Sequence, residues 1–312
     1  MKPTIKIDFV DFWDGFDKTD NFLWRLLSER YELILTDKPD FVIFSNYGTK
    51  FYFYKCIRIF YSRENERPDF SICDYAITSD FINRENHFRF PVFGSRYTPG
   101  ALQEQEQNNH EAFYKRSGFC CLVVSNGKSR KRIDFFETLS SKYKQVDSGG
   151  RYRNNVGYAV EDKNEFLKKY KFIIAFENSC YPGYTTEKLY DALVAGCIPI
   201  YWGDPKVTEY FNPKRFINYS SFKSEKALIE KIKDVNENDE LAKEILNEPC
   251  FINDSVPYYV APENLLNFFT GIFPRTLKKP VAFSKPKKLA HLLKSKKKHY
   301  LKKFFDHPKT FR

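Results

Sequence analysis

Residues 172–202 contain two apolar runs with a loop and a helical segment between them. The runs FIIAF (172–176) and CIPIYW (197–202) are short and rich in β-branched and aromatic residues, so both predict buried strands. The segment 186–195 has helical spacing and is followed by Gly196, a residue typical of the position after a helix. A strand, a helix and a second strand in this order constrain the chain to an α/β fold.

The same alternation recurs on both sides of this unit. The expected strands are 5–10, 31–35, 40–44, 56–61, 75–77 and 119–125, and the expected helices are 21–30, 131–139, 165–170, 224–233 and 239–248. A polar stretch at 101–115 has few core-forming residues and predicts a linker. The simplest architecture is two doubly wound domains facing a cleft, over 1–112 and 113–275, followed by a tail at 276–312.

The positive charge is concentrated in this tail. Residues 276–312 hold 13 Lys and Arg and one acidic residue, whereas the remaining 275 residues hold 38 basic and 39 acidic residues. A near-neutral body does not favour nucleic acid as a partner. Within the tail, 285–305 has leucines and aromatics at helical spacing among lysines, which predicts binding to an anionic membrane surface. A solvated tail without a partner is the alternative.

The cysteines and histidines exclude several kinds of site. Seven cysteines occur at irregular spacing without Cys-x-x-Cys, which indicates free thiols rather than a disulfide framework or a zinc site. The body contains two histidines, His87 and His110, so a general base there is expected to be a carboxylate. The first residues lack the apolar run of a signal peptide. The expectation is a cytoplasmic protein that reaches the inner membrane face only through its surface.

The loop before the helix at 186–195 is a candidate anion site. It follows a strand's carboxyl end, where α/β sheets bind ligands, and Gly183 permits a tight backbone. Glu187 and Lys188 fall in the first helical turn, where unpaired N–H groups and a lysine favour a diphosphate. The alternative is an ordinary solvated first turn.

The literal sequence of this region carries a resemblance. FENS (176–179), GYTTEK (183–188) and IPIYWGDP (198–205) resemble the donor-binding signature of the α-1,3-fucosyltransferases of glycosyltransferase family 10, in the style of the soluble bacterial members. Weaker similarity extends to DSGG (147–150), to the loop around Glu64 and to VDFW at 10–13, so that it covers most of residues 5–275.

The resemblance implies a GT-B fold, with the acceptor in the N-terminal domain and GDP-fucose in the C-terminal domain, and an inverting transfer. Glu64 is the expected catalytic base, with Glu66 as the alternative. Lys188 and Arg132 match the residues that bind the diphosphate. Three further basic residues, Lys128, Arg130 and Lys131, directly precede Arg132 in its loop. The remaining expected donor contacts are Glu187 at the ribose hydroxyls, with Asn178 and Tyr184 in the donor pocket.

A metal ion or other cofactor is not expected. The N-terminal acids, at 8, 11, 14, 17 and 20, form no Asp-x-Asp, and cationic residues would stabilise the departing GDP. Phe12 and Trp13 could instead stack on an acceptor sugar while Asp11 or Asp14 binds its hydroxyls. The alternative for this stretch is a polar loop after the first strand.

The main hypothesis is an α-1,3-fucosyltransferase that uses GDP-fucose and acts on the GlcNAc unit of a lactosamine-type oligosaccharide. One alternative is a GT-B transferase with another nucleotide sugar, and another is a non-catalytic sugar-binding or membrane-associated scaffold. Such a scaffold would be expected to lose Glu64, Arg132 or Lys188, and the chain retains all three.

Overall fold

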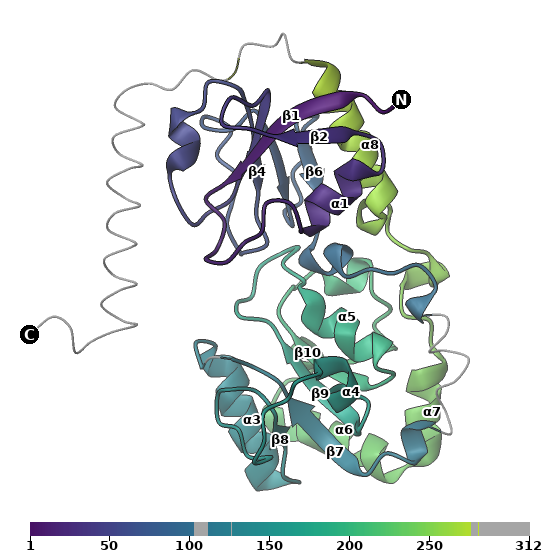
Figure 1. Ribbon diagram of the computed structural model, residues 1–312. Coiled ribbons are helices and arrows are strands. Elements are labelled where there is room, and N and C mark those ends of the chain that lie inside the picture. Colours follow the sequence, from purple (N-terminus) through teal and green to yellow (C-terminus); the bar gives the residue numbers. More distant parts are fainter. Residues whose placement is uncertain (103–111, 126, 276–279, 281–312) are drawn as a thin grey trace, which may run out of the picture. The chain divides into compact units, whose positions relative to one another are not determined.

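The computed structural model describes residues 1–102, 112–125, 127–275 and 280, and the chain forms two compact units (Figure 1). The first contains Met1–Thr78, Ile82–Phe90 and the chain from Pro262 onward, and the second contains Ser79–Phe81 and Pro91–Ala261. Most of the predicted linker at 101–115 lies outside the described residues. The predicted tail at 276–312 does so too except for Pro280, and the helix predicted at 285–305 lies wholly outside them.

The first unit contains a six-stranded sheet of order β2-β1-β3-β4-β5-β6, in which all neighbours pair in parallel. Its strands are β1 (Thr4–Val10), β2 (Glu32–Leu35), β3 (Phe41–Phe44), β4 (Ile57–Tyr61), β5 (Tyr75–Thr78) and β6 (His87–Arg89). Helices α1 (Phe22–Ser28) and α8 (Pro262–Ile272) lie on one face of the sheet (Figure 1). Because successive strand residues point to opposite faces, Val42 and Phe44 pack in a separate cluster with Phe51 and Phe60.

Helix α8 returns to the first unit although it follows the whole second unit in sequence. The ring of Phe268 lies 6.2 Å from that of Tyr75 and 5.4 Å from that of Phe88, and the ring of Phe273 lies 4.7 Å from that of Phe41. The division by contacts therefore differs from the predicted boundaries at 112 and 275. A local pattern cannot reveal this return, since α8 is defined by what its apolar face covers.

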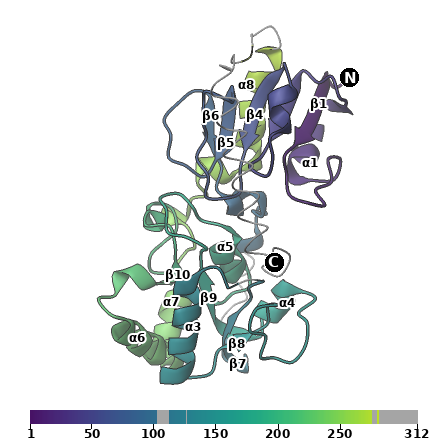
Figure 2. The ribbon, with the colours of Figure 1, turned by 90° about the vertical axis from the view of Figure 1, so that its left-hand side faces the viewer.

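The second unit contains a five-stranded parallel sheet of order β11-β10-β9-β7-β8, with helices on both faces (Figure 2). Its elements are β7 (Gly118–Leu122), α3 (Arg130–Lys142), β8 (Asp147–Ser148), α4 (Lys163–Leu167), β9 (Tyr170–Phe176), α5 (Glu187–Val194), β10 (Ile198–Trp202), β11 (Ile217–Asn218), α6 (Glu225–Glu237) and α7 (Asp239–Asn247). On β9, Phe172, Ile174 and Phe176 join a core cluster with α3 and α6, whereas Ile173 and Ala175 belong to clusters with α5. Burial on both faces explains why β9 is almost continuously apolar.

The predicted α/β fold, with two parallel sheets, is confirmed. The sequence pattern misses β6, β11 and α8, and it extends β7 to residue 125 although the strand ends at Leu122. In the described part of the chain, no helix has the length and apolar character needed to cross a bilayer.

Candidate active site

Loop 177–186 connects β9 to α5 in the second unit. Gly183 adopts φ +89°, and a Cβ at this residue would lie 2.3 Å from the Ser79 carbonyl oxygen, so no larger residue fits. Helix α5 begins at Glu187, and Thr186 directly before it directs its hydroxyl to the Glu177 carboxylate instead of capping the helix. The Thr186 side chain therefore leaves the first-turn N–H groups of α5 uncapped, and the amide of Glu187 is bonded to the carboxylate of the same residue.

Glu177 organises this loop from inside the protein. Its side chain is fully buried at the end of β9, where Oε1 accepts from the Thr186 amide (2.7 Å) and Oε2 from the Thr186 hydroxyl (2.6 Å) and Lys188 Nζ (3.1 Å). Burial raises the pKa of Glu177, and Lys188 and the bonds from Thr186 oppose this rise. A Cβ on Gly203 would lie 2.4 Å from Glu177 Cγ, so the glycine of the WGDP motif makes room for this carboxylate.

Lys188 lies between two carboxylates. Its Nζ is 3.1 Å from Glu177 Oε2 and 3.4 Å from Glu187 Oε1, and it also donates to Thr186 Oγ1 (2.7 Å). Burial alone would lower the pKa of Lys188, but the two carboxylates outweigh burial and raise it. Burial likewise acts to raise the pKa of Glu187, but Lys188, the helical amide and Lys163 lower it to about 2. Both side chains are therefore charged at neutral pH.

Arg132 reaches the same loop from α3. Its guanidinium is buried, with Nε donating to the Phe176 carbonyl (3.0 Å) and Nη2 to Asn178 Oδ1 (2.6 Å). Burial lowers the pKa of Arg132, and the negative charges of Glu177 and Glu187 oppose this effect. Arg132 thus fixes the end of β9 and the first residues of the loop.

The neighbouring cations point to other partners. Lys131 contacts the Tyr219 hydroxyl and Glu225 Oε1 (3.4 Å), and Arg130 lies 3.5 Å from Asp134. Among these adjacent basic residues of α3, Arg132 is the one bonded to loop 177–186.

The structure brings together all five residues predicted to contact the donor. Asn178 and Arg132 share a hydrogen bond, and Glu187 and Lys188 form an ion pair. Tyr184 is buried in the same loop, and Tyr184 and Glu187 both act to raise the pKa of Arg132 against the effect of burial.

Sequence reasoning assigned no role to Glu177, although this residue lies inside the FENS motif. A carboxylate directly after an apolar strand is costly to bury unless it is paired, and this cost was the signal available in the sequence. Thr185 and Asp204 were missed as well; Thr185 Oγ1 donates to buried Asp204 Oδ2 (3.1 Å).

Glu64, the predicted base, lies in the first unit. It is exposed, three residues beyond the end of β4, and its Oε1 accepts a hydrogen bond from the Tyr47 hydroxyl (2.7 Å). Glu66 lies in the same loop, and its amide donates to the Glu64 carbonyl (2.8 Å).

Asp11, predicted to bind acceptor hydroxyls, binds backbone amides of its own unit instead. Its two carboxylate oxygens accept from the amides of Lys50 and Phe51, both at 2.9 Å. Trp13, in contrast, is 38% exposed.

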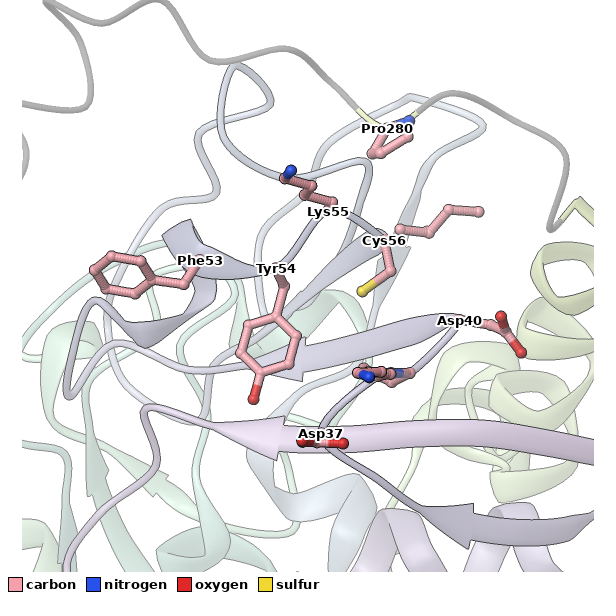
Figure 3. A pocket seen from close by; sticks show the side chains of 10 residues that line it. Asp37, Asp40, Phe53, Tyr54, Lys55, Cys56 and Pro280 are labelled. Carbon is pink, nitrogen blue, oxygen red and sulfur yellow. The ribbon is translucent and has the colours of Figure 1, made fainter.

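A cavity of about 650 Å³ lies in the first unit, at the end of the sheet opposite to that of Glu64 (Figure 3). Its lining includes Asp37 and Asp40 before β3, Phe53 and Tyr54, and Cys56 before β4, all of which are labelled in Figure 3. It therefore adjoins the amino ends of β3 and β4, whose carboxyl ends lead to Tyr47 and Glu64 respectively. Within the described ranges, no group of three or more His, Cys, Asp or Glu side chains is arranged to hold a metal ion.

Comparison with known proteins identifies the two halves separately. A family model described as the FucT N-terminal domain of α-(1,3)-fucosyltransferase matches residues 7–95, and one described as the C-terminal part of glycosyltransferase family 10 (fucosyltransferase) matches residues 113–246. A crystal structure of an α1,3-fucosyltransferase superposes with a TM-score of 0.75 at 30% identity, covering 88% of this chain and 91% of that one. A second crystal structure, with GDP-fucose, gives a TM-score of 0.74 at 29% identity and the same coverage.

Two curated relatives differ in extent. The α-(1,3)-fucosyltransferase FucT of Helicobacter pylori is 32% identical over 86% of this chain and 66% of its own length. The mouse 4-galactosyl-N-acetylglucosaminide 3-α-L-fucosyltransferase 9 is 32% identical over 39% of this chain and 34% of its own length. The chain thus spans just under two thirds of the bacterial relative and about one third of the mouse relative.

Proposed function

The chain belongs to glycosyltransferase family 10, the fucosyltransferases, and on this premise we propose that it is an inverting α-1,3-fucosyltransferase. It transfers L-fucose from GDP-β-L-fucose to the 3-hydroxyl of GlcNAc in lactosamine-type oligosaccharides. Its two α/β units, each with a parallel sheet, are those of the GT-B fold. The first unit receives the acceptor and the second receives the donor.

The observation that carries this proposal is the placement of two cations, Lys188 and Arg132, at loop 177–186 beside Glu177 and Glu187. Lys188 and Arg132 gather at the carboxyl end of β9, beside the uncapped first turn of α5, where a diphosphate is favoured. Glu187, ionised beside Lys188, accepts hydrogen bonds from the ribose hydroxyls, and Asn178 and Tyr184 complete the donor pocket. A crystal structure of a related α1,3-fucosyltransferase with GDP-fucose supports this choice of donor.

The reaction is a single displacement. Glu64 takes the proton of the acceptor hydroxyl as that oxygen attacks C1 of fucose, and the C1–O bond breaks with its electron pair on the β-phosphate of GDP. Lys188 and Arg132 stabilise the negative charge that develops on the leaving GDP. Because these cations supply the stabilisation, the proposed mechanism has no step that requires a metal ion.

The acceptor is inferred from chemistry and from a relative. The mouse relative is named a 4-galactosyl-N-acetylglucosaminide 3-fucosyltransferase, which supports GlcNAc substituted by galactose at O4 as the acceptor. Segment 285–305, which lies outside the described residues, is proposed to hold the protein at an anionic membrane surface on the cytoplasmic side, because its lysines accompany leucines at helical spacing.

The test is an assay of GDP release from GDP-fucose with N-acetyllactosamine, run with and without EDTA. We expect acceptor-dependent release that survives EDTA. Glu64→Gln is expected to lower kcat by about 10²–10⁴, as removal of a general base does, without preventing thermal protection by GDP-fucose. Glu66→Gln is the matched variant from the same loop, and a larger loss in Glu66→Gln would move the base there.

Two results would count against the proposal. Neither GDP release nor thermal protection by GDP-fucose would refute the donor and with it the activity. Equal transfer to lacto-N-biose, whose GlcNAc carries galactose at O3, would refute a strict preference for the 3-hydroxyl.

A further inference from the structure

Three side chains occupy equivalent positions beyond neighbouring strands of the first sheet. Trp13, Tyr47 and Glu64 each lie three residues past the end of β1, β3 and β4 respectively. These strands are adjacent and parallel, in the order β1-β3-β4. Since carboxyl ends of parallel strands meet at one edge of a sheet, three segments far apart in sequence bring these residues together.

Tyr47 is in contact with both of the other residues. Its hydroxyl donates to Glu64 Oε1 (2.7 Å), and its ring lies edge-on to that of Trp13, with centroids 6.3 Å apart and planes at 80°. Tyr47 and Trp13 are 41% and 38% exposed, so both present ring surface to solvent beside an exposed carboxylate.

Contacts with neighbouring residues of the first unit hold both rings in position. Trp13 packs edge-on against Phe16 (5.1 Å), which is stacked on Phe12 (4.0 Å). The Tyr47 amide donates to the Asp11 carbonyl (3.0 Å). The turn after Tyr47 requires Gly48, since a Cβ there would lie 2.2 Å from Asp11 Oδ1.

We propose that Tyr47 and Trp13 form the acceptor subsite for a pyranose ring, and that the Tyr47 hydroxyl is the positioning group for the base Glu64. The inference rests on the proposed fucosyl transfer. A pyranose presents an apolar C–H face that packs on aromatic rings and hydroxyl groups that reach a neighbouring carboxylate. Because one side chain touches both the platform and the base, the bound sugar and the base are held in a fixed mutual geometry, which is what proton transfer requires.

The test separates the two roles by steady-state kinetics with N-acetyllactosamine. Tyr47→Phe keeps the ring and removes the hydrogen bond, so kcat is expected to fall about tenfold or more while KM for the acceptor stays within about twofold. Trp13→Ala removes half of the platform, so acceptor KM is expected to rise about tenfold while kcat stays within about threefold.

Tyr54→Phe is the matched control. The Tyr54 hydroxyl donates to Asp8 Oδ2 (2.5 Å), so this variant removes a tyrosine–carboxylate bond from the same unit without touching Glu64. It is expected to leave both kinetic constants within about twofold. Thermal protection by GDP-fucose is expected to be equal in all variants, since the donor residues lie in the second unit.

Each failure has a distinct signature. With an active wild-type protein, an unchanged kcat in Tyr47→Phe refutes the positioning role, and an unchanged acceptor KM in Trp13→Ala refutes the platform. Kinetic losses in Tyr54→Phe equal to those in Tyr47→Phe would show a general effect on the unit and also refute the positioning role. A wild-type protein without acceptor-dependent GDP release refutes the proposed function itself, and this inference with it.

Discussion

The Glu177–Lys188 pair can be tested by a double-mutant cycle on stability. Glu177 is fully buried with its Oε2 3.1 Å from Lys188 Nζ, and both residues lie in the second unit. Glu177→Gln keeps the size of the side chain and removes its charge, while Lys188→Met keeps the aliphatic stem and removes the ammonium. The double variant replaces the pair with two neutral side chains of similar volume.

The geometry sets the expected magnitude. Opposite unit charges 3.1 Å apart attract by about 5 kcal/mol at an effective dielectric constant of 20. Lys188 is 18% exposed and keeps Glu187 as a second partner at 3.4 Å, so we expect each single variant to lower the free energy of unfolding by about 2–3 kcal/mol. The double variant should lose about 2 kcal/mol less than the two single losses combined, because the interaction is removed only once.

The assay is urea unfolding of the four proteins, followed by far-UV circular dichroism at pH 7. The matched control is the exposed pair Lys206–Glu209, whose charged atoms lie 3.0 Å apart at 44% and 51% exposure. Its cycle, with Lys206→Met and Glu209→Gln, should give a coupling below about 1 kcal/mol. If the buried pair shows a coupling as small as the exposed one, the claim that Glu177 and Lys188 stabilise each other is wrong.

Three further predictions concern other parts of the chain. The pKa of Glu187 is lowered from 4.5 to about 2, so the ionised side chain stabilises the fold above pH 4.5 and this contribution is lost as the pH falls towards 2. The difference in unfolding free energy between wild type and Glu187→Gln should be about 3 kcal/mol at neutral pH and should shrink towards zero between pH 4.5 and pH 2. A difference that does not change with pH would contradict this prediction. Gly203→Ala places a Cβ 2.4 Å from Glu177 Cγ and should lower the unfolding free energy by about 1–3 kcal/mol, whereas Gly271→Ala, with no atom within 4 Å, should be neutral or stabilising; equal effects in a melting experiment would refute the packing argument. Removal of residues 276–312 should abolish sedimentation with vesicles of anionic lipid and leave kcat in solution within about twofold, and a large fall in kcat would show that this segment contributes to the fold.

Much of the fold could be read from local patterns. The run FIIAF lies within β9, and β10 and α5 lie within the ranges predicted for them, because a strand buried on both faces must be apolar throughout and a helix between two such strands must be amphipathic. The short strands β6 (His87–Arg89) and β11 (Ile217–Asn218) were not predictable, since two or three residues carry no period and are strands only through pairing with a neighbour.

The candidate site, too, has features that could be predicted from the sequence and features that could not. The α/β class, the family and the segment 176–188, which carries four of the five candidate donor residues, were predictable from the sequence because they are properties of contiguous segments. Arg132 lies outside this segment, in α3. Three contacts became visible only in the folded chain. Glu177 accepts hydrogen bonds from Lys188 and Thr186, Asp11 accepts them from backbone amides, and Tyr47 contacts both Trp13 and Glu64. Trp13, Tyr47 and Glu64 follow different strands, and the parallel pairing of those strands, which no local pattern encodes, brings the side chains to one edge of the sheet.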